Sequence, residues 1–157
     1  MRRYHVNMVD LQTASEEKLR EAIELFYFAY RTFTNGPDHM LDERGLGRVH
    51  HRILYFVGRN PQIAINALLE ILDVSKQALH APLRALLEAR LVVMQADEQD
   101  RRFKRLSLTS EGKKLEARLT GAQMKLLSAV FAATGARAQA AWKIVMRDIS
   151  RRGGIKS

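Results

Sequence analysis

The sequence predicts a mainly α-helical protein with one small β-hairpin. Apolar residues recur at helical spacing over residues 15–34, 42–59, 63–72, 76–91, 110–133 and 137–152. An apolar run at 91–94 and an alternating run at 103–109 flank a charged loop, which is typical of a hairpin. The chain has 157 residues, 46% of them hydrophobic, so we expect one domain with a real core, with or without extensions for a partner subunit.

The first two helices are predicted from their caps. Thr13 and Ser15 precede two glutamates, a good helix start, and the Asn-Gly-Pro-Asp run at 35–38 predicts the end of that helix. Asp42 and Glu43 then open a second helix that runs to about residue 59, where Asn-Pro closes it. We expect Leu46, Val49, Ile53, Leu54 and Val57 to point inward.

The next two helices are short and separated by a tight break at Asp73. Ser75 is a natural N-cap for the second of them. The leucine spacing of this second helix continues through Pro82, so we expect the helix to be bent but continuous. The opposite face carries Lys76, Gln77, His80 and Arg84. Two short helices with a polar, cationic face on the second are typical of a helix-turn-helix.

The hairpin follows this pair directly, and its loop is strongly cationic. The cations are Arg101, Arg102, Lys104 and Arg105. A helix-turn-helix followed by such a hairpin is a winged helix, whose second helix enters the major groove while an arginine at the hairpin tip reaches the minor groove. We expect Asp97 and Asp100 to brace the tip by pairing with Arg101 and Arg102 or with backbone N–H groups.

Charge is distributed unevenly along the chain. Residues 1–70 hold nine Lys or Arg and nine Asp or Glu, whereas residues 71–157 hold seventeen and eight, so the second part carries the whole net charge of +9. This predicts a polyanionic partner, nucleic acid first and an anionic membrane second. A non-specific architectural or RNA-binding protein would explain the charge, but not the helix-turn-helix and wing.

The wing segment resembles that of the MarR family of bacterial transcriptional regulators. Its signature, Asp-x-x-Asp-Arg-Arg, alternating apolar residues, then Leu-Thr-x-x-Gly, stands here as Asp97, Asp100, Arg101, Arg102, Leu106, Leu108, Thr109 and Gly112. The resemblance covers roughly residues 13–152, with Asp73 and Pro82 as departures. It implies a homodimer that binds a pseudo-palindromic operator in double-stranded DNA, usually as a repressor, and that in many members releases DNA when a small aromatic or phenolic ligand binds.

We therefore interpret residues 1–157 as a single MarR-like domain. Residues 42–109 would form the winged helix-turn-helix lobe, and 13–34 and 110–152 the dimerisation helices, whose apolar surface exceeds what one small lobe can cover. DNA contacts are expected from Ser75, Lys76, Gln77, His80, Arg84, Arg101, Arg102 and Lys104. Candidates for the effector site are Tyr30, His50, His51, Arg52 and Tyr55.

Other classes of site are not favoured by the residues. There is no cysteine, and adjacent histidines on a helix point about 100° apart, so neither a metal site nor a cofactor is expected. We find no phosphate-binding glycine loop, nucleophile elbow or paired acids of an enzyme. No segment has the roughly 18 apolar residues of a membrane span, and we expect a cytoplasmic protein.

Overall fold

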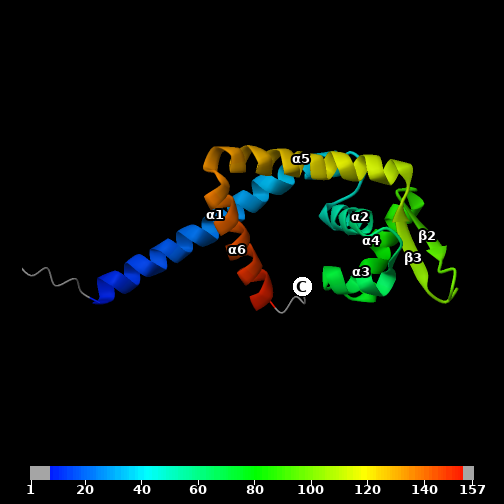
Figure 1. Ribbon diagram of the computed structural model, residues 1–157, viewed down its shortest axis with the longest axis horizontal. Coiled ribbons are helices and arrows are strands. Elements are labelled where there is room, and N and C mark those ends of the chain that lie inside the picture. The colour runs from blue at the N-terminus through cyan, green and yellow to red at the C-terminus, as the bar shows by residue number, and fades with distance from the viewer. Residues whose placement is uncertain (1–7, 154–157) are drawn as a thin grey trace, which may run out of the picture. The chain divides into compact units, whose positions relative to one another are not determined.

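The computed structural model describes residues 8–153, in two compact units divided between Asn35 and Gly36 (Figure 1). The ends of the expected domain, residues 1–7 and 154–157, lie outside the described residues. The elements are α1 (Met8–Asp42), α2 (Arg48–Arg59), β1 (Ile63–Ala64), α3 (Ile65–Leu72), α4 (Lys76–Glu88), β2 (Val92–Ala96), β3 (Lys104–Leu108), α5 (Ser110–Thr134) and α6 (Ala136–Arg152). The predicted class, mainly helical with a small hairpin, is confirmed.

The first helix does not end at the Asn-Gly-Pro-Asp run. It continues through Pro37 to Asp42, so the prediction of a break at 35–38 was wrong. Proline removes one helical hydrogen bond at a cost of about 3 kcal/mol. Tertiary contacts offset that cost: Pro37 and Leu41 are buried, and the Asp38 carboxylate takes a bidentate ion pair from Arg48 at 2.8–3.2 Å.

The second helix begins later than predicted. Gly45 adopts a left-handed conformation with φ +66°, and the N–H groups of Gly45 and Leu46 bond to the last carbonyls of α1. Asp42 therefore closes one helix instead of opening the next, and α2 starts at Arg48. Val49, expected inward from the longer helix, is exposed.

The sheet has a third strand that the sequence did not predict. The order is β1-β3-β2, all antiparallel, with Ile63 opposite Leu106 and Val92 opposite Leu108. β1 has only two residues, too short to give any alternating pattern. It positions α3, whose first residue follows it directly.

The hydrophobic core lies where α2, α3, α4, the sheet and the first half of α5 meet. Its fully buried side chains are Leu41, Ile53, Leu54, Val57, Leu68, Leu86, Leu106, Leu115 and Leu119. The predicted apolar face of α4 is confirmed, since Leu79, Leu83 and Leu86 are buried and the helix is continuous through Pro82. One core thus holds both helices of the helix-turn-helix and the base of the wing.

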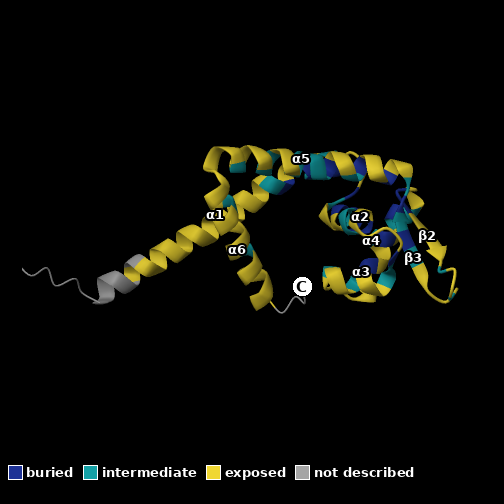
Figure 2. Ribbon diagram, viewed as in Figure 1, coloured by how far each residue is buried: buried dark blue, intermediate teal, exposed yellow. Residues whose placement is uncertain are grey.

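Outside this core the helices remain apolar and exposed (Figure 2). On α1 these side chains are Leu19, Ile23, Leu25, Phe26, Tyr27, Phe28 and Tyr30. In the second unit they include Met124 and Val130 of α5 and Trp142, Ile144, Val145 and Ile149 of α6. Ile23 is 69% exposed, more than an isolated folded chain normally leaves on an apolar helix face.

Candidate nucleic-acid interface

The polar face of α4 stands away from the core. Ser75 caps the helix, its Oγ accepting the N–H of Ala78 at 3.1 Å, as predicted. Lys76, Gln77, His80 and Arg84 are all exposed. Arg84 donates from Nε to the Glu88 carboxylate at 2.8 Å, which holds its guanidinium along the helix. A narrow cationic helix face of this kind suits the major groove.

The turn before α4 depends on one residue in an unusual conformation. Asp73 ends α3 with φ 51° and ψ 48°, in the left-handed region that glycine adopts most easily. Its N–H and that of Val74 bond to carbonyls of the last turn of α3. The sequence therefore makes the tight break with an aspartate, in a backbone conformation where glycine is the usual residue at helix ends.

The base of the wing is locked to the start of α5. Thr109 caps α5, accepting the N–H of Gly112 at 3.0 Å, while its hydroxyl donates to the carbonyl of Arg90 at 2.7 Å. Its own N–H bonds to the carbonyl of Leu91 at 3.1 Å. Gly112 lies so close that a Cβ there would be 1.9 Å from the Leu91 oxygen. The Leu-Thr-x-x-Gly part of the signature is thus a packing requirement.

The tip of the wing is braced by two aspartates. Asp97 accepts Nε of Arg105 at 2.6 Å and the N–H groups of Gln99 and Asp100 at 2.8 and 3.2 Å. Arg102 binds both oxygens of Asp100 at 2.7–3.2 Å. The hydrogen bond from Arg105 is the main reason that the pKa of Asp97 lies below its ordinary value. The hydrogen bond from Arg102 does the same for the pKa of Asp100.

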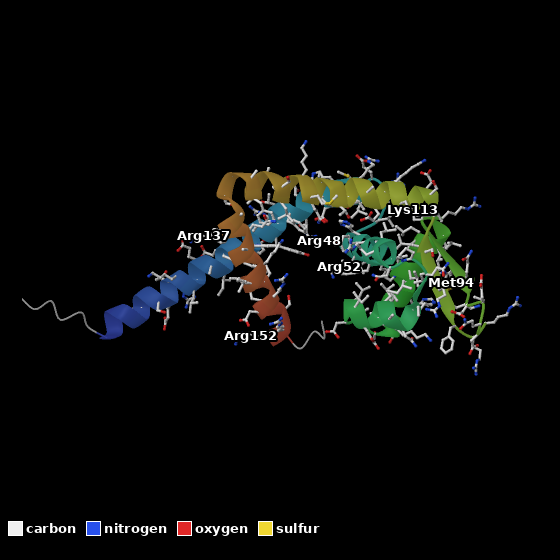
Figure 3. The ribbon with its side chains drawn as sticks, viewed as in Figure 1. Arg48, Arg52, Met94, Lys113, Arg137 and Arg152 are labelled. Carbon is white, nitrogen blue, oxygen red and sulfur yellow. The ribbon has the colours of Figure 1, made fainter. Side chains whose placement is uncertain are left out.

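The expected bracing by Asp97 and Asp100 is confirmed through backbone N–H groups and through Arg102. The cation paired with Asp97 is Arg105, because Asp97 faces Phe103 across the hairpin and Arg105 lies on the same side of β3, two residues on. Arg102 is committed to Asp100. Arg101 and Lys104 are exposed, and neither forms an ion pair with another residue that the structure describes. Figure 3 shows the side chains of the tip projecting away from the hairpin.

The two histidines of α2 are occupied within the fold. His50 Nδ1 accepts the N–H of Gly47 at 2.9 Å and so caps the helix. His51 is 9% exposed, with Nε2 3.4 Å from the Thr120 hydroxyl. That hydroxyl donates to Glu116 at 2.6 Å, so Nε2 of His51 carries the hydrogen. Burial lowers the pKa of both histidines.

The other effector candidates are distributed over both units. Arg52 of α2 is exposed (Figure 3), and Tyr55 is half-buried, with its ring edge-on to Phe56 at 5.1 Å. Tyr30 lies on α1 in the other unit and is exposed. The two histidines among the effector candidates thus make hydrogen bonds within the fold, whereas Arg52 presents its charge to solvent.

Across residues 8–153, no three His, Cys, Asp or Glu side chains gather closely enough to hold a metal ion. No helix in that same range has the length and apolar character needed to span a bilayer.

The fold and its cationic face define a winged helix-turn-helix protein. The chain matches the MarR family profile over residues 44–102. It is also 39% identical over 132 residues to the HTH-type transcriptional regulator PetP of Rhodobacter capsulatus, covering 84% of this chain and 80% of that one. The protein belongs to the MarR family, and it is a DNA-binding transcriptional regulator.

Solved structures agree with this fold. Staphylococcus aureus MarR in complex with salicylate and kanamycin aligns with a TM-score of 0.70 at 22% identity, over 92% of this chain and 97% of that one. The MepR–DNA complex of the same species aligns with a TM-score of 0.67 at 18% identity, over 82% and 96%. At these identities the likeness concerns the fold alone.

Proposed function

We propose that this protein is a homodimeric repressor that binds a pseudo-palindromic DNA operator and is released from it by a small aromatic ligand. The observation that supports the DNA contact is that α4 and the base of the wing share one core. The exposed cations of α4 and the exposed Arg101 therefore belong to one compact unit. The solved MepR–DNA complex supports a DNA partner for this fold. Acting on DNA, the protein would be cytoplasmic.

The proposed DNA contacts divide into two kinds. Gln77 and Arg84 of α4 would touch base edges, and Ser75, Lys76 and His80 would add phosphate or base contacts. Arg101 would enter the minor groove, with Lys104 beside it. Arg102 would act mainly as a brace, because its guanidinium is already paired with Asp100.

The test of the wing contact is the salt dependence of DNA binding. A site is first selected from a random DNA pool, which also gives its symmetry and half-site spacing. Arg101→Ala should then weaken binding by about 1–3 kcal/mol and reduce the slope against log salt by roughly one. Arg137→Ala removes the same charge from α6 (Figure 3) and serves as the control. Equal affinities for Arg101→Ala and the unmodified protein at matched salt would refute the contact.

The dimer is proposed from the exposed apolar faces. We assign residues 42–109 to the DNA-binding lobe and 13–34 and 110–152 to dimerisation within one domain, residues 1–157. Light scattering should give twice the chain mass of 17.9 kDa. Ile23→Glu should give monomers and weaken operator binding, because two linked half-site contacts become one. Ile71→Ser, an exposed apolar position on α3, should stay dimeric.

The effector is proposed to be a flat aromatic anion such as a benzoate or a phenol. Arg52 offers an exposed guanidinium and Tyr55 an aromatic edge on the same helix; Tyr30, His50 and His51 remain weaker candidates. The complex of Staphylococcus aureus MarR with salicylate supports an aromatic acid for this fold. A ligand that lowers DNA affinity tenfold must favour the non-binding state by about 1.4 kcal/mol.

The effector is tested by titrating the preformed DNA complex with a panel of aromatic acids. Release by one of them at millimolar concentration supports the proposal, and Arg52→Gln should raise the concentration needed without changing DNA affinity. Arg59→Gln, at the C-terminal end of α2, should leave that concentration unchanged. If no acid releases DNA, the ligand-relieved mechanism is wrong.

A further inference from the structure

An aromatic ring stands exposed in the middle of the cationic wing. Phe103 precedes β3 and is 52% exposed. Its main chain is fixed on both sides, since its N–H bonds to the carbonyl of Asp100 at 3.0 Å and its carbonyl accepts the N–H of Asp97 at 2.9 Å. Alternation along the strand turns Leu106 and Leu108 to the core and Phe103 to the other face. The ring therefore cannot move into the core without breaking the tip.

The hairpin has no evident structural need for this ring. The turn is closed by the two backbone bonds of Phe103 and by the pairs of Asp97 and Asp100, none of which uses the side chain. Within the described part of the chain, the Phe103 ring stacks on no other ring and on no cation. A polar residue would complete the same loop and expose less apolar surface to water.

We propose that Phe103 packs against the deoxyribose walls of the minor groove beside Arg101. This rests on the wing contact of the proposed function. The neighbouring cations, Arg101 and Lys104, would be drawn to phosphates, and between the phosphates lie the sugars, whose C–H surface suits an aromatic ring. Proteins that bind the minor groove do place apolar side chains there, mostly as wedges between base steps, so an apolar residue beside groove-binding arginines is compatible with DNA. The ring thus supplies an apolar contact that charge pairing cannot.

Such a contact has its own signature in the salt dependence. Neutralised phosphates release counterions and set the slope of affinity against salt, whereas apolar burial does not. We expect Phe103→Ser to weaken operator binding about tenfold, equal to about 1.4 kcal/mol, which corresponds to burying roughly 55 Å² of apolar surface. That is about a third of the area that a phenylalanine can bury.

The experiment measures DNA affinity over a range of salt concentrations, together with thermal melting. Phe103→Ser should give a line parallel to that of the unmodified protein and about tenfold weaker, while Phe103→Leu should keep most of the affinity. Val93→Ser is the matched control, because Val93 is an exposed apolar residue near the other end of the hairpin. All three variants should melt at the temperature of the unmodified protein.

Comparison with Arg101→Ala separates this inference from the proposed function. If Arg101→Ala weakens binding and Phe103→Ser does not, the ring contact is refuted and the wing contact stands. If neither variant changes binding, the wing contact itself fails. A reduced salt slope in Phe103→Ser would mean that the ring only positions arginines, and a lower melting temperature would assign it to folding. Either result overturns the inference.

Discussion

Substitution of Gly112 by alanine tests the junction between the wing and α5. The added Cβ would lie 1.9 Å from the carbonyl oxygen of Leu91 and 2.9 Å from its carbon. Both atoms belong to the backbone, so no side-chain rotation relieves the overlap. The start of β2 must move away by about 1 Å before the contact reaches even the 3.0 Å lower limit of real Cβ contacts.

The cost follows from what that movement breaks. Overpacking against a rigid neighbour costs about 1–3 kcal/mol. The same movement separates the Thr109 hydroxyl from the carbonyls of Arg90 and Leu91, and a lost hydrogen bond costs about 0.5–1.5 kcal/mol. We therefore expect Gly112→Ala to lower the free energy of unfolding by about 1.5–4.5 kcal/mol, a large part of the roughly 5–15 kcal/mol typical of a domain.

The assay is urea unfolding followed by far-ultraviolet circular dichroism. Gly121→Ala is the control on the same helix, since a Cβ at Gly121 meets nothing within 4 Å. Because alanine is the better helix former, that variant should be more stable than the unmodified protein by up to about 1 kcal/mol. The reasoning is refuted if Gly112→Ala unfolds within about 1 kcal/mol of the unmodified protein.

Three further predictions concern the wing, α2 and the turn before α4. Asp97→Asn should weaken DNA binding, measured by fluorescence anisotropy, and lower the urea midpoint only slightly, because a partly exposed ion pair adds little stability while the Arg105 pair shapes the tip. Burial depresses the pKa of His51 in the folded state, so the unfolded chain binds its proton more readily. The free energy of unfolding should therefore be constant above pH 6.5 and fall as the pH drops below it. Asp73→Gly should raise stability in urea by up to about 1 kcal/mol, because glycine adopts the left-handed conformation without strain.

Each of these predictions has a matched control. Glu98→Gln removes a neighbouring carboxylate and should not weaken DNA binding; equal losses in both variants would contradict the bracing role of Asp97. His51→Gln should reduce the fall in stability at low pH, although not abolish it, since burial also lowers the pKa of His50. Gly45 also has a left-handed backbone, with φ +66°. Gly45→Ala should therefore lower stability, the opposite of the change expected for Asp73→Gly.

Much of the architecture was predictable because its determinants are local. The caps at Ser75 and Thr109 bond to N–H groups three residues away, within the reach of a sequence motif. The leucine spacing of α4 reports its buried face directly, and for that reason it outweighed Pro82. The fold class and the family resemblance followed from such features, while the DNA-contacting roles of individual residues remain predictions.

Tertiary contacts decided the rest. α1 passes Pro37 because the following turn buries Leu41 and pairs Asp38 with Arg48, contacts that no local propensity encodes. β1 exists only because β3 is there to pair with it. Gly112 is required because the carbonyl of Leu91, from another part of the chain, lies against it. Sequence periodicity determined which faces are apolar and where most helices lie. Only the tertiary structure determined which backbone groups and charged side chains, distant in the sequence, come into contact. Such contacts depend on the positions of all the elements together.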